Sequence, residues 1–160
     1  GNAGDDTITG SSGNDTVYGG LGDDTVNYSG NNAASFILGH DGNDNLIGGS
    51  GNDTLVGGAG VDQLTGGDGA DRFFFQNKTQ SSSFSLDRIT DFNNTDIAAT
   101  NHDLIDINGF GFTGIVSGEA SGTTLGYTSN GAETLITSAD NSFKLVLTGN
   151  YILDAGDFIF

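Results

Sequence analysis

The chain of 160 residues contains no cysteine, proline, methionine or tryptophan. Without cysteine it can have neither a disulfide framework nor thiol chemistry. A secreted protein of this composition needs another brace, such as bound metal ions. The sequence also shows no signal peptide and no apolar run long enough to span a membrane.

Basic residues are almost as scarce. Four Lys and Arg residues face 21 acidic residues, which gives a net charge of −17. Before Phe73 the only basic residue is Arg72, so the acidic groups have almost no internal counter-ions. Such a chain binds nucleic acid poorly and is repelled by anionic lipid, so we expect no nucleic-acid or membrane partner. Calcium is the obvious external ion to neutralise it.

What the sequence does contain is a nine-residue repeat, Gly-Gly-x-Gly-x-Asp-x-apolar-x, with copies beginning at residues 1, 10, 19, 39, 48, 57 and 66. Glycine allows positive φ and lets backbones crowd together, and aspartate supplies the hard oxygen that Ca²⁺ prefers. Positions seven to nine predict a short strand whose eighth residue points inward. The repeat aspartates are Asp6, Asp15, Asp24, Asp44, Asp53, Asp62 and Asp71. The inward residues are Ile8, Val17, Val26, Leu46, Leu55, Leu64 and Phe73.

This pattern resembles the calcium-binding nonapeptide of RTX proteins, which forms a parallel β-roll. The resemblance implies that two repeats make one coil and that calcium lies between stacked turns. One edge would carry Asp6, Asp24, Asp44 and Asp62, and the other Asp15, Asp53 and Asp71. Further ligands would be backbone carbonyls of repeat glycines such as Gly20, Gly22, Gly49, Gly51, Gly58 and Gly60.

Residues 28–38 interrupt the pattern. They take the place of a repeat, are two residues too long and contain no aspartate. We therefore expect a bulged, calcium-poor turn, with Phe36 filling the inward position. About four well-formed calcium sites remain, paired between the aspartates of stacked turns. The pairs are Asp6/Asp24, Asp24/Asp44, Asp44/Asp62 and Asp53/Asp71.

The second half differs in composition, because glycine becomes rarer and ten of the eleven phenylalanines lie at or after Phe73. Short alternating runs separated by Gly, Asn and Ser predict hairpin strands. These runs are 71–75, 86–92, 102–110, 123–129, 133–138, 143–149 and 156–160, and 76–85 predicts a loop. The predicted fold is therefore all-β, with a calcium-binding β-roll over 1–74 and a cap of mostly antiparallel strands over 75–160.

Residues 86–110 carry D-x-I-x-D-F followed by D-x-I-D-I-x-G-F. This segment resembles two secreted families, the C-terminal domain of serralysin-type metalloproteases and the R-module of bacterial mannuronan C-5-epimerases. Residues 109–118, 122–150 and 153–160 favour the R-module. That resemblance implies a non-catalytic, monomeric, extracellular module whose parent epimerises β-D-mannuronate to α-L-guluronate in alginate. Its partners would be the parent's catalytic module and a type I secretion apparatus.

The chain has neither the proline of the epimerase active-site motif nor the three histidines of a serralysin zinc site. Gly1 falls at a repeat boundary without an initiator methionine, which suggests a piece of a longer chain. The acidic-then-apolar end, 157–160, is either a secretion signal or the last strand. A structural roll such as an ice-binding protein or adhesin is a third class, but its threonine array would be too broken here.

Several residues besides the repeat aspartates and glycines are candidate sites. Asp87, Asp91, Asp103 and Asp106 either bind a further calcium ion or cap turns. Alginate is a polyanion, so we expect weak binding or none, with Arg72 and Lys78 the best candidates to meet uronate carboxylates. His40 and His102 are expected to be surface or turn residues. The Gly109–Gly114 segment is expected to be a turn, since no βαβ unit surrounds its G-x-G-x-x-G pattern.

Overall fold

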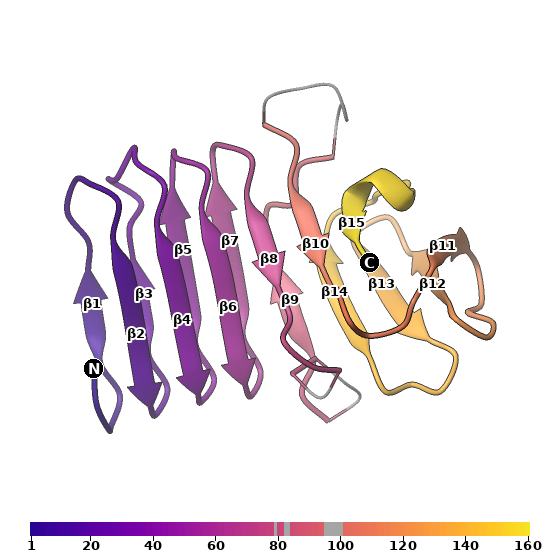
Figure 1. The fold of residues 1–160 in the computed structure, drawn as a ribbon, viewed down its shortest axis with the longest axis horizontal. Coiled ribbons are helices and arrows are strands. Elements are labelled where there is room, and N and C mark those ends of the chain that lie inside the picture. Colours follow the sequence, from indigo (N-terminus) through magenta and orange to yellow (C-terminus); the bar gives the residue numbers. More distant parts are fainter. Residues whose placement is uncertain (79, 82–83, 95–100) are drawn as a thin grey trace.

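A computed structural model describes residues 1–78, 80–81, 84–94 and 101–160. These residues form fifteen strands and one 3₁₀ turn in two facing sheets (Figure 1). The repeat half contains β1 (Thr7–Thr9), β2 (Thr16–Leu21), β3 (Thr25–Asn27), β4 (Phe36–Asp41), β5 (Asn45–Gly49), β6 (Thr54–Ala59), β7 (Gln63–Gly67) and β8 (Arg72–Phe74). The remainder contains β9 (Asp87–Ile89), β10 (Leu104–Asp106), β11 (Gly114–Ser117), β12 (Thr124–Ser129), β13 (Glu133–Ser138), β14 (Lys144–Thr148), η1 (Ala155–Asp157) and β15 (Phe158–Ile159).

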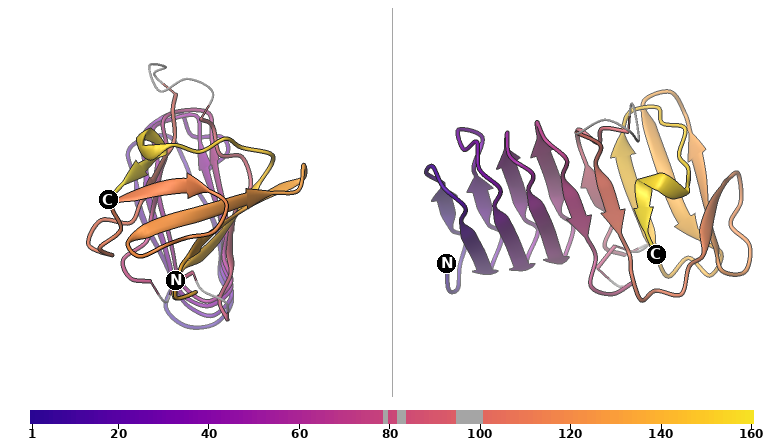
Figure 2. Two further views of the ribbon diagram at one scale, coloured as in Figure 1. Left: turned by 90° about the vertical axis from the view of Figure 1, so that its right-hand side faces the viewer. Right: turned by 45° about the horizontal axis from the view of Figure 1, so that its top comes forward.

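Odd-numbered and even-numbered strands of the repeats enter different sheets. One sheet has the order β1-β3-β5-β7-β9-β14-β13-β12-β11, and the other has the order β15-β10-β8-β6-β4-β2. Each coil therefore places one strand in each sheet, and successive coils stack in parallel along the long axis of the molecule (Figure 2). The predicted all-β parallel β-roll is confirmed.

The strand register confirms that two repeats make one coil. Thr7 pairs with Thr25, and Asn45 pairs with Gln63, each 18 residues apart. Thr25 pairs with Asn45 instead, 20 residues away, because the interruption adds two residues. Several strands also extend beyond positions seven to nine, since the glycines that follow pair with the next coil, as Gly49 does with Gly67.

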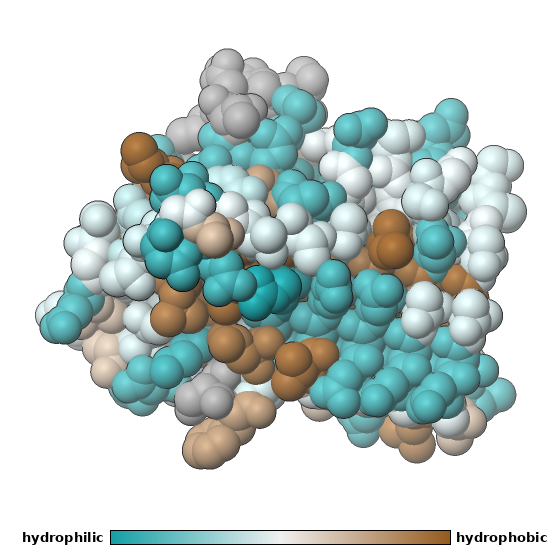
Figure 3. Space-filling model, turned by 180° about the vertical axis from the view of Figure 1, so that it is seen from behind, coloured by the Kyte–Doolittle hydropathy of each residue, from teal (hydrophilic) through white to brown (hydrophobic). Residues whose placement is uncertain are grey.

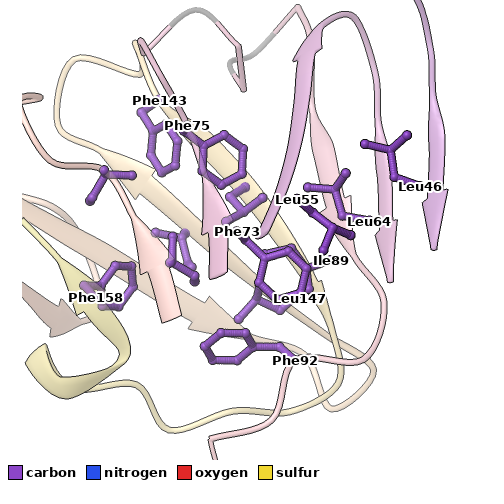
Figure 4. Close-up of a cluster of buried hydrophobic side chains, with 14 of the residues drawn as sticks. Leu46, Leu55, Leu64, Phe73, Phe75, Ile89, Phe92, Phe143, Leu147 and Phe158 are labelled. Carbon is purple, nitrogen blue, oxygen red and sulfur yellow. The ribbon is translucent and has the colours of Figure 1, made fainter. Parts of the chain in front are cut away.

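The core runs between the two sheets and consists of the predicted inward residues. Val26, Leu46 and Leu55 are completely buried, and the apolar row continues through Leu64 and Phe73 into the C-terminal half (Figure 4). Full burial of an aliphatic or aromatic side chain stabilises a fold by about 1.5–3 kcal/mol. Burial of this row therefore stabilises the stacking of the coils in a way that does not depend on metal.

The interruption contradicts one expectation about this row. Ile37, not Phe36, fills the inward position of β4, where it is 0% exposed and pairs with Val17 and Leu55. The two extra residues precede β4, and alternation along the strand then turns Phe36 outward. Phe36 lies at the level of Thr16 and Thr54 and is half-buried on the outer face.

The parallel stacking continues beyond residue 74. β9 pairs in parallel with β7, and β10 pairs in parallel with β8. The predicted boundary between roll and cap, after residue 74, therefore falls between β8 and β9. The stacks of parallel strands continue across it in both sheets. β14 and β15 extend the two sheets, again in parallel. Within the described ranges, antiparallel pairing is confined to β13 and its neighbours β12 and β14, so the prediction that the cap strands are mostly antiparallel is wrong, because these strands continue the parallel stacks of the roll.

The predicted strands of the second half are all present in shorter or equal form, and β11, which was not predicted, is added. The predicted loop over 76–85 includes residues 79, 82 and 83, which lie outside the described residues. Among the described residues, no helix is long and apolar enough to span a bilayer.

Phenylalanines form the core of the C-terminal half, as expected. Phe143 is 0% exposed and packs edge-to-face on Phe75 and Phe110, at 5.6 and 5.7 Å between ring centroids. Phe84 is instead 97% exposed. Seen from behind, the half that holds the repeats is hydrophilic or neutral over most of its surface, while hydrophobic side chains gather near its junction with the C-terminal strands (Figure 3).

Candidate calcium sites

The repeat aspartates stack along both edges of the roll, where each links its turn to the preceding one. The backbone N–H of Asp24 donates to Asp44 Oδ1 at 2.8 Å, and that of Asp44 donates to Asp62 Oδ1 at 2.9 Å. On the other edge the N–H of Asp53 donates to Asp71 Oδ1 at 2.8 Å. One carboxylate oxygen in each turn is therefore committed to a hydrogen bond between coils.

The second carboxylate oxygen has no such partner. In the described chain, Oδ2 is buried without a hydrogen bond in Asp15, Asp24, Asp44, Asp53, Asp62, Asp71 and Asp87. Burying an unpaired charge is costly, and burial raises the pKa of Asp44, Asp62 and Asp71 to about 6, 7 and 8. Each raised pKa is the signature of a carboxylate that needs a cation or a proton in the folded turn.

In the regular repeats from residue 19 onward, the unpaired oxygen lies against the first glycine of its own repeat. A Cβ added to Gly39 would lie closer than 3.0 Å to Asp44 Oδ2 and to the Gly57 carbonyl oxygen. The same relation holds at Gly19, with Asp24 Oδ2 and the Gly39 carbonyl oxygen. The turn thus brings a carboxylate oxygen and a backbone carbonyl oxygen of the next coil close together beside one glycine. Hard oxygen donors of these two kinds fit Ca²⁺.

The first glycines of the repeats were not among the carbonyl ligands predicted from the sequence. The second and fourth glycines, such as Gly58 and Gly60, have φ values of 121° and 142° and press against the backbone of the preceding coil. No side chain fits there. A ligand role for Gly20, Gly22, Gly49, Gly51, Gly58 and Gly60 stays a prediction.

The aspartate ladders extend past the last nonapeptide. The N–H of Asp62 donates to Asp87 Oδ1, and that of Asp71 donates to Asp103 Oδ1, both at 2.9 Å. Burial raises the pKa of Asp87 to about 8 and that of Asp103 to about 6. Asp87 resembles a repeat aspartate, because its Oδ2 is also buried and unpaired, which adds Asp62/Asp87 to the candidate pairs. Asp103 continues the ladder only, since its Oδ2 accepts the backbone N–H of Asn93 at 2.8 Å.

The other two acids of that segment act differently. Asp91 accepts the backbone N–H groups of Gly66 and Gly67 with its two carboxylate oxygens, at 2.9 and 2.8 Å. Asp91 therefore caps a turn, which is one of the two roles expected for it from the sequence. Asp106 is buried and forms a salt bridge with Arg72, so its charge is balanced within the protein.

The interruption breaks the ladder between Asp15 and Asp53. Ser35 occupies the place of a repeat aspartate, and its N–H donates to Asp53 Oδ1 at 2.7 Å. Burial and the neighbouring Asp15 carboxylate, to which the Tyr28 side chain is hydrogen-bonded, raise the pKa of Tyr28. No second carboxylate faces Asp15 across this turn in the described chain, in agreement with the expected calcium-poor geometry.

A second ladder was not recognised in the sequence. At position five, Asp5 Oδ1 accepts the N–H of Asp23 at 2.9 Å, and Asp23 Oδ1 accepts the N–H of Asn43 at 2.7 Å. Position five thus reaches forward to the next coil, while position six reaches back. The recurring Asp-Asp and Asn-Asp pairs are the sequence signal that could have revealed it.

The basic residues proposed for uronate contacts are engaged within the protein. Arg72 lies over the Phe74 ring, 4.8 Å from its centroid, besides its salt bridge with Asp106. Lys78 Nζ lies 4.7 Å from the centroid of Phe112. Their predicted role in alginate binding is untested.

Each histidine lies near one aspartate of the ladders, His40 near Asp44 and His102 beside Asp103. His102 is only 8% exposed, contrary to expectation, because it packs under η1, with Nε2 3.5 Å from Asp157 Oδ1. His40 is exposed in a turn. Across the described ranges, no three His, Cys, Asp or Glu side chains converge as a metal cluster. That agrees with turns that supply one carboxylate each and take their other oxygens from the backbone.

Comparisons with known proteins agree with this geometry. The family model of the RTX calcium-binding nonapeptide repeat matches residues 1–33 and 38–73 in four copies. None of the curated proteins matches the chain. Among solved structures, the solution structure of the AlgE6R3 subunit from the Azotobacter vinelandii mannuronan C5-epimerase is 33% identical, with a TM-score of 0.64 over 100% of this chain and 80% of that one.

The AlgE6R2 subunit of the same organism's mannuronan C5-epimerase is 32% identical, with a TM-score of 0.61 over 96% of this chain and 91% of that one. Repeats, fold and whole-length similarity therefore coincide. The chain belongs to the family of RTX calcium-binding R-modules found in mannuronan C5-epimerase.

Proposed function

We propose that this chain is a non-catalytic module of a secreted alginate-modifying enzyme, a mannuronan C5-epimerase, and that calcium binding between its coils makes it fold. The observation that carries the proposal is the row of buried, unpaired Oδ2 atoms of Asp24, Asp44, Asp53, Asp62 and Asp71, each against the first glycine of its repeat. Calcium bound only by the stacked turns would convert binding energy into folding energy.

Four pairs of stacked turns have a buried, unpaired Oδ2 in both aspartates: Asp24/Asp44, Asp44/Asp62, Asp53/Asp71 and Asp62/Asp87. Extracellular calcium modules bind with dissociation constants of roughly 10⁻⁴–10⁻³ M. The module would therefore remain unfolded where calcium is scarce and fold where it reaches millimolar concentration. This behaviour suits export through a type I apparatus followed by folding outside the cell.

The similarity to two epimerase subunits over nearly the whole chain favours an epimerase parent over a metalloprotease. In such a parent, chemistry resides in a separate catalytic module, and this chain stabilises it. The test is a fusion to the catalytic module of a mannuronan C5-epimerase. We expect slower thermal inactivation at millimolar calcium than for the catalytic module alone. The matched control carries Asp53→Asn, Asp62→Asn and Asp71→Asn. Equal inactivation rates for all three proteins would refute the supporting role.

Alginate binding by the isolated module is expected to be weak. Four calcium ions would bring the net charge of −17 to only −9, and Arg72 and Arg88 are paired with Asp106 and Glu133. Long-range repulsion of a polyuronate thus persists. Calorimetry against oligomannuronate at millimolar calcium and modest salt tests this. A low-micromolar dissociation constant would refute the charge argument.

A further inference from the structure

The interrupted turn keeps its coils in register without an aspartate. Ile37 pairs with Val17 on one side and with Leu55 on the other, as regular coils do. Yet Ser35 stands where the ladder requires a carboxylate. Something other than an ion must therefore join the turns on this edge between Asp15 and Asp53.

The Tyr28 ring lies against Gly10, the first glycine of the repeat that stacks on this turn at the same edge. A Cβ added to Gly10 would lie closer than 3.0 Å to the Cγ, Cδ1 and Cε1 atoms of the Tyr28 ring. At Gly19, the same position lies beside Asp24 Oδ2 and a carbonyl oxygen. Tyr28 is 7% exposed, so a buried aromatic ring stands here where regular turns have the carboxylate oxygen.

Asn31 supplies the polar contacts of this turn. Its side chain is 97% buried, since the residue is 3% exposed. Nδ2 donates to the Gly13 carbonyl at 2.8 Å and to Ser35 Oγ at 3.0 Å, while Oδ1 accepts from Ala33 N at 3.1 Å and Gly13 N at 3.3 Å. All four bonds of a primary amide are thus accounted for.

The backbone of Asn31 extends the link to the following turn. Its carbonyl accepts the N–H of Ser50 at 2.8 Å. One residue therefore joins three successive turns of the same edge. A cation can join carbonyl oxygens only while it is bound, whereas an amide donates to a carbonyl at any calcium concentration.

We propose that Asn31 and Tyr28 form a clasp that replaces a calcium ion, so that this level of the roll is held together independently of calcium. This inference rests on the proposed function, in which the other turns bind calcium. It divides the roll into turns whose local stability rises with calcium and one turn whose local stability does not. The coils on either side would then stay joined when neighbouring ions leave.

Amide hydrogen exchange of the whole chain tests the clasp, over calcium concentrations at which the module stays folded. For a saturated site, local opening that releases one ion becomes tenfold rarer for each tenfold rise in calcium. We expect a slope near one for log protection against log calcium at the Asp24 and Asp44 amides. We expect a slope near zero at the Gly13 and Ala33 amides.

The outcomes separate the clasp from the ion sites. A slope near one at Gly13 and Ala33 would overturn the clasp alone. A slope near zero at Asp24 and Asp44 would overturn the proposed ion sites. A single steep slope at all four amides would also contradict the clasp, because no turn would then be independent of calcium.

Asn31→Ala provides the second measurement. It should lower protection at Gly13 and Ala33 roughly tenfold, the loss expected for about one hydrogen bond, without changing the number of calcium ions bound. The matched control is Asn43→Ala, since Asn43 Oδ1 accepts the Val61 N–H at 2.9 Å on the opposite edge. It should leave Gly13 and Ala33 unchanged. Loss of one bound ion in Asn31→Ala would show that residue 31 serves an ion site, which would refute the clasp.

Discussion

Replacing Asp62 by asparagine should cost no stability without calcium but should destabilise the module when calcium is bound. Asp62 is 1% exposed, its Oδ1 accepts the Asp44 N–H at 2.9 Å, and its Oδ2 is unpaired. Asparagine keeps the acceptor and the shape but removes the charge. Burial raises the pKa of Asp62 to about 7, so the ion-free turn favours a neutral side chain. Without calcium, Asp62→Asn should therefore be at least as stable as the original protein.

With calcium the order should reverse. A site at a hundred times its dissociation constant contributes about 2.7 kcal/mol. For a chain of this length, that corresponds to a fall in Tm of roughly 5–11 °C in Asp62→Asn. The assay is thermal unfolding followed by circular dichroism from excess chelator to 10 mM calcium. Asp23→Asn is the matched control, since Asp23 is exposed and its Oδ1 accepts a backbone N–H in the same way. Parallel Tm curves for Asp62→Asn and the original protein at every calcium concentration would refute the ion-site reasoning.

Three further predictions follow from the same geometry. Asp15→Asn should lower Tm at saturating calcium by less than half the Asp62→Asn effect, because the Tyr28 ring lies against the first glycine of the Asp15 repeat; equal shifts would contradict this. Gly57→Ala should remove about one ion from the calcium count measured by calorimetry without changing the net charge, since its Cβ would collide with Asp62 Oδ2; an unchanged count would place the ion elsewhere. The pKa values of Asp44, Asp62 and Asp71 rise to about 6, 7 and 8 from an ordinary value near 3.9, so the ion-free fold is favoured at low pH and loses that stability as pH rises through these values. In chelator, β-structure by circular dichroism should accordingly be greater at pH 5.5 than at pH 8, and the reverse order would contradict the shifts.

The repeat half was largely predictable because local and global requirements coincide there. One aspartate and one apolar residue per nine residues set the coil length, the inward row and the two edges together. Leu46 and Leu55 lie where the period places them. The inward residue of 28–38 could not be predicted in this way. This segment contains Phe36, Ile37 and Leu38 in succession, and periodicity alone does not determine which of them points inward.

The continuation of the ladders was harder to predict because it depends on contacts between distant segments. Asp87 and Asp103 follow their stacked partners by 25 and 32 residues, not 18. The spacing rule that identified the repeats could not reach them. The same holds for Arg72, whose salt bridge with Asp106 depends on β10 stacking against β8.

Calcium-dependent folding of the roll can be tested by a single titration. The whole chain is followed by far-ultraviolet circular dichroism from excess chelator to 10 mM calcium at pH 8, while bound calcium is counted in parallel. Eleven aspartates before residue 75 repel one another without an ion, and the apolar content there is too low to offset chain entropy. We expect a disordered spectrum over the repeats in chelator and a transition to β-structure as several ions bind. A full β-spectrum in chelator, unchanged by calcium, would contradict it.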